Sequence, residues 1–431
     1  MTASTNHLLP KNYELREVFT AGGFPKLTYV RRDHLKLESD LRHALDKGFA
    51  IIAITGQSKS GKTVLAGAVT EGNKVIKVHG GQCQTSDDIW SQILHQAGES
   101  FEKNKNLLSM DSEETGIKGG LSLGIGNVEI NQKAGNQNSV NSTIEYFNNP
   151  KMQAISFLKN NKIILIIDDF HYMEEKARKD TIRALKPYVF DGGQVIVISV
   201  PYRAFSVVDA EGEMEGRFRH IEIPEWTSSD LMRILEAGEP LLNVRFSQSM
   251  KVSFTNEALG NPLLTQNFCF DACYNEGVKS TCPQEFKFED DFNCNAVFVK
   301  AAQDVGFPIF SKLERGPQSR SDRLPRPFKN GSKGDTYQSI LAAIAVTGPQ
   351  KELSYETIRS ALREEILKSN YPQKHEVTAA IKQMVGIAKD IERDNPAIDF
   401  HEDRVFIQNP FFQFYLRWIH RPNFAESLDL R

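Results

Sequence analysis

Long hydrophobic runs are missing from this sequence of 431 residues. The longest, such as those at 163–167, 195–200 and 340–346, fall far below the ~18 residues that a membrane-spanning helix needs. The first twenty residues mix charged and polar side chains and lack the apolar stretch of a secretory signal. We therefore expect a cytoplasmic protein that does not enter a membrane.

The sequence also has few cysteines and no large excess of charge of either sign. The five cysteines form no CxxC pair, so we expect free thiols in a reducing compartment rather than a disulfide framework or a zinc ribbon. The 52 Lys and Arg nearly balance the 55 Asp and Glu, for a net charge of −3. This balance argues against a protein that coats nucleic acid or a membrane surface. The length corresponds to roughly two or three domains.

What the sequence does contain is a phosphate-binding motif. The strand-like run 49–55 leads into GQSKSGKT at 56–63, which has the G-x-x-x-x-G-K-[ST] pattern between a strand and a helix. Its glycines allow the backbone to wrap a phosphate, and the positive end of the following helix favours the anion. The residues expected to bind ATP here are Gly56, Gln57, Ser58, Lys59, Ser60, Gly61, Lys62, Thr63 and Val64.

Two carboxylates complete the expected site. Lys62 should reach the β- and γ-phosphates, and Thr63 should place its hydroxyl on Mg²⁺. The apolar run at 163–167 predicts a strand of a parallel sheet, buried on both faces. Asp168 and Asp169 follow at its carboxyl end, where ligands bind in α/β sheets. Asp168 is expected to hold Mg²⁺ through water and Asp169 to polarise the attacking water. The alternative for Asp169 is a cap on the next segment.

Other polar residues follow later strands. Ser199, at the end of a third strand at 195–200, is a candidate sensor of the γ-phosphate, and Arg203 lies just beyond it. Arg217 precedes a short alternating strand and is a candidate arginine finger that reaches the nucleotide of a neighbouring subunit. A solvated basic turn is the alternative for Arg217. If Arg217 acts in trans, the active form must be a multimer.

The run from Thr28 to Leu65 resembles the entry into P-loop ATPases of the AAA+ and STAND superclass (signal-transduction ATPases with numerous domains), including the archaeal-type ATPases. The sequence IIDDF around Asp168 is closer to STAND relatives, although the strand before Arg203 lacks the Thr-Thr-Arg of many of them. The resemblance implies that Tyr29, Val30 and Arg32 pack on the adenine, and that Pro262 of a Gly-Asn-Pro turn backs the nucleotide from a lid. It also implies a winged helix followed by an aromatic tail.

Together these features predict an α/β fold in three parts. A P-loop NTPase core with a parallel sheet is expected over 1–225, a helical lid over 226–310 and a winged-helix domain over 335–431. A Gly-rich insertion at about 102–141 interrupts the core and is either a strand-forming arm for self-assembly or a flexible loop. A linker at 311–334 is rich in Pro, Gly and Ser and carries seven Lys or Arg against two acidic residues.

The pattern within the last hundred residues supports the winged helix. Helices are predicted at 335–347, 354–368 and 374–389, and a two-strand wing at 397–408. The segment 351–431 holds twelve basic and thirteen acidic residues, so we expect a structural or protein-binding winged helix rather than one that binds DNA. The basic linker is either a contact for the phosphate backbone of DNA or a solubilising connection.

Three functional hypotheses follow. The leading one is a slow, Mg²⁺-dependent ATPase that acts as a switch, in which ATP controls self-assembly into a homo-oligomer or the binding of a protein partner. The resemblance places such switches in bacterial defence or signalling. The first alternative is a DNA-associated ATPase resembling replication initiators or transposition regulators. The second is a nucleotide-sensing scaffold without useful turnover.

Overall fold

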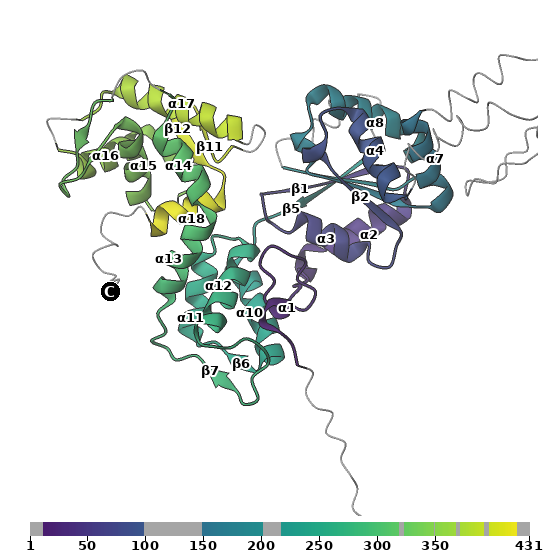
Figure 1. Ribbon diagram of the computed structural model, residues 1–431, viewed down its shortest axis with the longest axis horizontal. Coiled ribbons are helices and arrows are strands. Elements are labelled where there is room, and N and C mark those ends of the chain that lie inside the picture. The colour runs from purple at the N-terminus through teal and green to yellow at the C-terminus, as the bar shows by residue number, and fades with distance from the viewer. Residues whose placement is uncertain are drawn as a thin grey trace, which may run out of the picture. The chain divides into compact units, whose positions relative to one another are not determined.

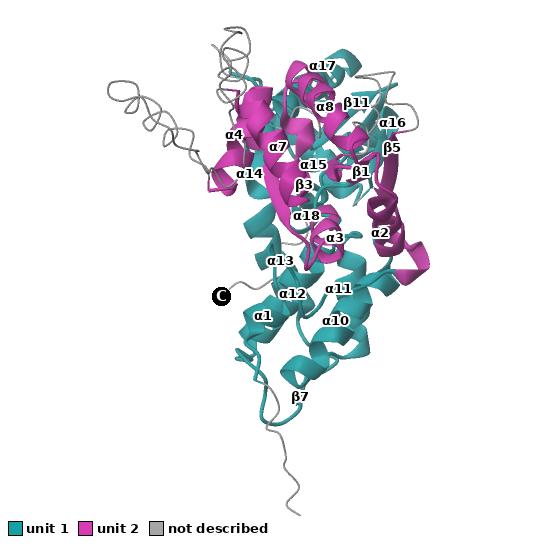
Figure 2. Cartoon of the chain, turned by 90° about the vertical axis from the view of Figure 1, so that its right-hand side faces the viewer, with its two compact units in different colours: residues 1–32, 57–60, 224–431 teal, residues 33–56, 61–223 magenta. Residues whose placement is uncertain are grey.

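The structure is a computed structural model of the sequence. It describes residues 12–98, 149–200, 217–318, 323–348, 350–367, 371–391 and 396–419. The chain forms two compact units (Figure 2). The sheet unit comprises residues 33–56 and 61–223, and the helical unit comprises residues 1–32, 57–60 and 224–431. The tip of the GQSKSGKT loop, at 57–60, therefore belongs to the helical unit.

The sheet unit is built on a five-stranded parallel sheet with the strand order β2-β3-β4-β1-β5 (Figure 1). Its strands are β1 (Ile51–Gly56), β2 (Val75–His79), β3 (Ile164–Asp168), β4 (Val195–Ser199) and β5 (Phe218–Ile223). The strands predicted at 49–55, 163–167 and 195–200 are confirmed as β1, β3 and β4. Because β4 lies between β1 and β3, the sheet brings the carboxyl ends of all three to one edge.

Helices cover both faces of this sheet (Figure 1). On one face lie α4 (Ser86–Gln96), α7 (Pro150–Asn161) and α8 (Glu175–Phe190), and on the other α2 (Leu37–Lys47) and α3 (Lys62–Val69). Short 3₁₀ turns are η1 (Asp33–Leu35), η2 (Gly80–Gln82) and η3 (Phe170–Tyr172). Along β3, Leu165 and Ile167 pack under the first group of helices and Ile164 and Ile166 under the second. Burial on both faces explains why β3 is continuously hydrophobic.

The predicted lid forms the first part of the helical unit. It consists of α10 (Ser228–Leu242), β6 (Val244–Arg245), α11 (Gln248–Glu257), α12 (Pro262–Asn275), β7 (Phe286–Lys287) and α13 (Cys294–Val305). Aromatic side chains fill its centre: the ring of Phe268 lies 5.6 Å from that of Phe254 and 4.8 Å from that of Phe298, both edge to face. Such pairs add to the free energy gained by burying the rings.

The start of the described chain packs on this lid. In α1 (Leu15–Val18) and just after it, Leu15, Val18 and Phe19 are buried in the lid core against α10 and α12. A Cβ at Gly238 of α10 would lie 2.3 Å from the Phe19 ring, so this glycine makes room for it. Leu15, Val18, Phe19 and Val30, which the sequence analysis assigned to the core at 1–225, are thus buried in the lid.

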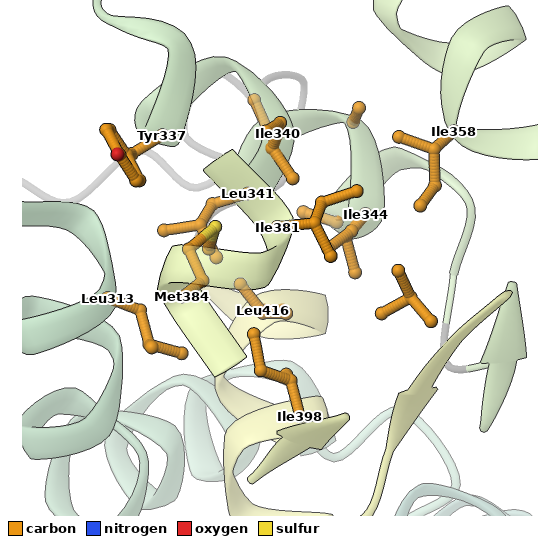
Figure 3. Close-up of a cluster of buried hydrophobic side chains, with 14 of the residues drawn as sticks. Leu313, Tyr337, Ile340, Leu341, Ile344, Ile358, Ile381, Met384, Ile398 and Leu416 are labelled. Carbon is orange, nitrogen blue, oxygen red and sulfur yellow. The ribbon is translucent and has the colours of Figure 1, made fainter. Parts of the chain in front are cut away.

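Residues 307–419 form what we call the C-terminal lobe. Its elements are α14 (Phe307–Arg315), β8 (Arg326–Pro327), β9 (Lys333–Gly334), α15 (Thr336–Val346), β10 (Glu352–Ser354), α16 (Tyr355–Glu365), α17 (Lys374–Ile391), β11 (Ile398–His401), β12 (Arg404–Ile407) and α18 (Pro410–Trp418). The strands β10, β12 and β11 form an antiparallel sheet. These elements agree with the three helices and the hairpin predicted from the sequence. Figure 3 shows the buried core, where Leu341 and Ile344 of α15 lie near Ile381 and Met384 of α17.

The predicted linker at 311–334 is partly regular structure. Helix α14 continues to Arg315, because Phe310 and Leu313 are buried in the core of the lobe. Further on, β8 and β9 pair in an antiparallel hairpin. The Pro, Gly and Ser content of this segment did not predict this regular structure.

Helix α18 belongs to two cores at once. Phe412 and Leu416 are buried in the core of the C-terminal lobe, whereas Phe414 and Trp418 are buried in the core of the lid. The Trp418 ring lies 4.8 Å from that of Phe298, and its indole nitrogen donates to Glu257 Oε2 at 2.9 Å. The aromatic tail predicted from the sequence thus packs internally and joins the lid to the lobe.

Phe414→Ala is expected to lower the free energy of unfolding by about 3–5 kcal/mol, because it removes a fully buried ring from the lid core. Urea denaturation followed by circular dichroism measures this loss. The matched control is Phe307→Ala, whose ring is 53% exposed and whose removal should cost at most about 1 kcal/mol. Equal losses for both variants would contradict the role of α18 in joining the two cores.

Candidate functional site

The GQSKSGKT loop joins β1 to α3. Its backbone φ angle is positive at Gly56, Lys59 and Gly61. Glycine adopts such conformations without steric cost, which explains the two glycines of the motif. Gly61 is the N-cap of α3, and the first turn of this helix has no acidic side chain. Nothing negative on the helix therefore competes with an anion at its positive end.

Lys62 is the first residue of α3 and is largely buried, with 9% of its surface exposed. Its Nζ donates to the backbone oxygen of Gly56 at 2.8 Å. The Lys62 side chain thus reaches across the loop to its first residue, Gly56. A buried ammonium requires acceptors, and its position places a positive charge within the loop, as phosphate binding requires.

Thr63 and Asp168 meet although they are 105 residues apart in the sequence. Thr63 Oγ1 donates to Asp168 Oδ2 at 2.9 Å, and the amide of Asp169 donates to Oδ1 at 3.0 Å. Lys77 of β2 forms an ion pair with Oδ2 at 2.8 Å. The hydroxyl and carboxylate oxygens are hard ligands of the type that Mg²⁺ binds together with water and phosphate oxygens. These residues therefore fit the metal that the sequence predicts.

Asp169 has a left-handed backbone with φ of +55° and precedes η3. Asp169 is the N-cap residue of η3, but its side chain makes no capping hydrogen bond to this turn. A Cβ at Gly80 of η2 would lie 2.6 Å from the Asp169 carbonyl oxygen, which shows how closely the ends of β2 and β3 approach. His171, two residues further on, is buried.

Two buried hydroxyls lie beside the loop. Ser199 ends β4, where it is paired in register with Thr55 of β1, and Ser60 belongs to the loop itself. They are 1% and 5% exposed, and neither Oγ has a hydrogen-bond partner in the described part of the chain. Buried hydroxyls nearly always have a partner. A ligand with acceptor oxygens at this edge of the sheet would supply one.

The loop tip is held by residues that follow β5. The indole nitrogen of Trp226 donates to the Ser60 backbone oxygen at 2.9 Å, and the Gln57 amide donates to the Glu225 carboxylate. The sequence analysis missed Trp226, which carries no motif and lies 166 residues from Ser60. The local sequence signal beside Trp226 is the capping box that Thr227 forms at the start of α10.

One of the residues predicted to contact the adenine, Arg32, lies against the same tryptophan. The Arg32 guanidinium is buried, lies 4.4 Å from the centroid of the Trp226 ring and donates to the Pro224 oxygen at 3.0 Å. Val30 is buried in the lid core, and Tyr29 is half-buried. On the lid, Asn261 caps α12 with Pro262 as its first residue. A Cβ at Gly260 would lie 3.2 Å from the Trp226 carbonyl oxygen, so this turn also adjoins Trp226.

Comparison with known proteins bears on the fold. No protein-family model matches the chain, and no curated protein matches it. Among solved structures, the Walker-type ATPase of Pyrococcus abyssi is similar over 90% of this chain and 97% of its own, with 14% identity and a TM-score of 0.50. The ORC2 protein of Aeropyrum pernix, in ADPNP–ADP complexes, is similar over 94% of this chain and 98% of its own, with 14% identity and a TM-score of 0.50.

The chain has the P-loop ATPase fold. At these identities the likeness shows the fold alone. A STAND protein with a tetratricopeptide repeat sensor from Pyrococcus horikoshii is also similar, with 12% identity and a TM-score of 0.36 over 92% of this chain and 43% of its own. That score is too low to support any argument about this chain.

Within the P-loop ATPase fold, Arg217 lies at the edge opposite to the phosphate loop. Its backbone oxygen accepts from the amide of Ile51, at the start of β1, whereas Gly56 at the end of β1 pairs with Ile223. A strand of this length spans about 20 Å, so Arg217 cannot reach the phosphate loop of its own sheet unit. Its exposed guanidinium lies 4.9 Å from the ring centroid of Phe190. Any contact of Arg217 with nucleotide must therefore be made in trans.

Two features predicted from the sequence are not described by the structure. Arg203 and the Gly-rich insertion at 102–141 lie outside the described residues.

All five cysteines are free, and burial raises the pKa of the Cys269 and Cys273 thiols above its ordinary value. These two thiols are therefore poor nucleophiles and poor metal ligands. In the described ranges, no cluster of His, Cys, Asp and Glu is arranged to hold a metal, and no helix combines the length and apolarity needed to cross a membrane.

The cations of the predicted basic linker make contacts inside the C-terminal lobe. Arg323 pairs with Asp335 at 2.6 Å, and Arg326, which is only 4% exposed, pairs with Glu376 at 3.1 Å. Lys329 Nζ donates to the Arg363 backbone oxygen at 3.0 Å. These charges are already used to hold the β8–β9 segment on the lobe, which leaves them less available to a phosphate backbone.

Proposed function

We propose that this chain is a Mg²⁺-dependent ATPase that acts as a regulatory switch. The observation that carries the proposal is the set of contacts around one loop: Lys62 spans the loop, and Thr63 donates to Asp168. The buried hydroxyls of Ser60 and Ser199 add two groups that need an acceptor. A triphosphate is rich in acceptor oxygens and in negative charge, so it meets each of these requirements.

Each residue then has a role. Lys62 would bind the β- and γ-phosphates, and Ser199 would donate to the γ-phosphate. Thr63 and Asp168 would hold Mg²⁺, which when bound neutralises charge on the phosphates. Asp169, whose side chain makes no cap, would orient and polarise the attacking water.

The base would be recognised by the helical unit. Tyr29, Val30, Arg32 and Pro262 remain the proposed contacts, and Trp226 connects them to the loop through Ser60. Since Arg32 is held by the Trp226 ring and the Pro224 oxygen, it would act by fixing this surface rather than by pairing with phosphate.

We assign the switch to the C-terminal lobe, which we propose is a winged helix. Glu225 accepts from Gln57 of the loop tip and forms an ion pair with Lys351 of the lobe. Exposed ion pairs contribute only about 0–1 kcal/mol, so this connection is easily broken. ATP at the loop would disturb Gln57 and, through Glu225, free Lys351 of the lobe for contacts in self-assembly or with a protein partner, in defence or signalling.

Mass measurement in solution with and without ATP tests the switch. We expect the Asp169→Asn protein, which should retain ATP, to form a larger assembly with Mg²⁺ and ATP than without nucleotide. Mixing it with Arg217→Ala should restore part of the hydrolysis that each variant lacks, because each supplies the group missing from the other. A single mass under both conditions and no recovery at any mixing ratio would refute the switch and the arginine finger.

A DNA-associated ATPase is the second candidate, for which the observation is the basic composition of 311–334, where Lys329 is exposed. Its test is binding of duplex DNA at rising salt concentration, since phosphate contacts give a steep salt dependence. Lys329→Gln is the suitable variant, because Arg326 is buried and its loss would disturb folding. Strong, salt-sensitive binding that Lys329→Gln weakens would favour this candidate over a protein-binding lobe.

A further inference from the structure

A lysine outside the phosphate loop contacts the carboxylate proposed for the metal. Lys77 lies in the middle of β2, and its Nζ is 2.8 Å from Asp168 Oδ2. The Asp168 side chain is 7% exposed and the Lys77 side chain 35% exposed. The contact thus joins a buried acid to a cation that enters from the rim of the site.

The sheet register explains how Lys77 reaches Asp168. β2 and β3 are parallel neighbours, with Lys77 opposite Ile166 and His79 opposite Asp168. Lys77 is therefore the diagonal neighbour of Asp168, within reach of a long side chain. Ile76 and Val78 point into the core under α4, α7 and α8, so the alternation of the strand puts Lys77 on the other face.

Packing does not account for a lysine at this position. Val75 and His79, which share the face of Lys77 on β2, are both exposed, so an uncharged side chain would fit there equally well. Asp168, in contrast, needs compensation, because a buried carboxylate without a positive partner is costly. Thr63 and the Asp169 amide supply hydrogen bonds but no charge. Lys77 supplies the charge.

We infer that Lys77 is a positioning residue that acts through Asp168, as an internal counter-ion in place of the divalent cation. It keeps the site nearly neutral before Mg²⁺ arrives, so ATP binds without metal and Mg²⁺ binds less tightly than it would to a free carboxylate. The inference rests on the proposed ATPase function and adds to it a dependence on the free Mg²⁺ concentration.

The sign of the effect follows from electrostatics. Removing the ammonium leaves a net negative charge beside the phosphates, which repels metal-free ATP and attracts a divalent cation. A neutral residue at position 77 should thus shift the two affinities in opposite directions. A variant that merely loosened the fold would weaken both.

The experiment compares Lys77→Met and Lys77→Gln with the matched control Lys74→Met, which removes an exposed lysine just before β2. Calorimetry gives the dissociation constant of ATP in excess EDTA, and a Mg²⁺ titration of the ATP-bound protein gives the metal affinity. For both neutral variants we expect ATP to bind about tenfold more weakly in EDTA and Mg²⁺ to bind about tenfold more tightly. Lys74→Met and the conservative Lys77→Arg should stay within about twofold of the unmodified protein.

The outcomes separate the two proposals. If the unmodified protein binds ATP in neither condition, the proposed function fails and the inference fails with it. If it binds ATP but Lys77→Met and Lys77→Gln behave like Lys74→Met, or weaken both affinities together, only the counter-ion role is overturned.

Discussion

Replacing Lys62 with alanine is expected to abolish detectable ATP binding. The Lys62 ammonium places a positive charge across the loop, from α3 to the Gly56 oxygen. Its loss would remove about two charge-assisted hydrogen bonds to phosphate, of roughly 1.5–3 kcal/mol each. The dissociation constant of Mg²⁺-ATP should therefore rise at least about a hundredfold, as measured by calorimetry.

The control for this variant is Lys47→Ala, which removes an exposed lysine at the end of α2. Its ATP affinity should equal that of the unmodified protein, and circular dichroism should show both variants folded. ATP binding by folded Lys62→Ala within about threefold of the unmodified protein would mean that the loop is not the nucleotide site.

Asp169→Asn should keep ATP binding and lower hydrolysis about 10²–10⁴-fold, the contribution of a positioned acid or base. Asparagine tolerates the left-handed backbone found at Asp169, so the variant removes the charge with little other change. Single-turnover hydrolysis measures the chemical step directly. Glu174→Gln removes a nearby exposed acid and should hydrolyse ATP at the original rate.

An unchanged rate in Asp169→Asn would contradict the assignment of the base. Should the unmodified protein bind ATP without any single-turnover hydrolysis, the nucleotide-sensing scaffold would replace the ATPase. The single-turnover assay thus tests both the role of Asp169 and the ATPase activity, because ATP binding is measured separately.

Local patterns in the sequence predicted the parts of the site that are local in the chain. The phosphate loop lies within eight residues, with hydrophobic runs marking β1 and β3, so its position and its strand, loop, helix context were predictable. The same holds for the helices and hairpin of the C-terminal lobe, whose apolar residues repeat with regular periods.

Contacts between distant segments could not be predicted in this way. The order of the sheet, with β4 between β1 and β3, depends on pairing that no local pattern encodes. The Lys77–Asp168 and Trp226–Ser60 contacts depend on this arrangement and on the turn after β5.

Helix α18 gives the lid and the C-terminal lobe a shared core, so the two cannot shift independently without exposing Phe414 or Trp418. Thermodynamic linkage then works in both directions. Whatever factor ATP imposes on the affinity of the lobe for its partner, the partner must impose on the affinity for ATP. A partner that binds the lobe would thus change the affinity for ATP without contacting the phosphate loop. The rate of nucleotide release would then report partner binding.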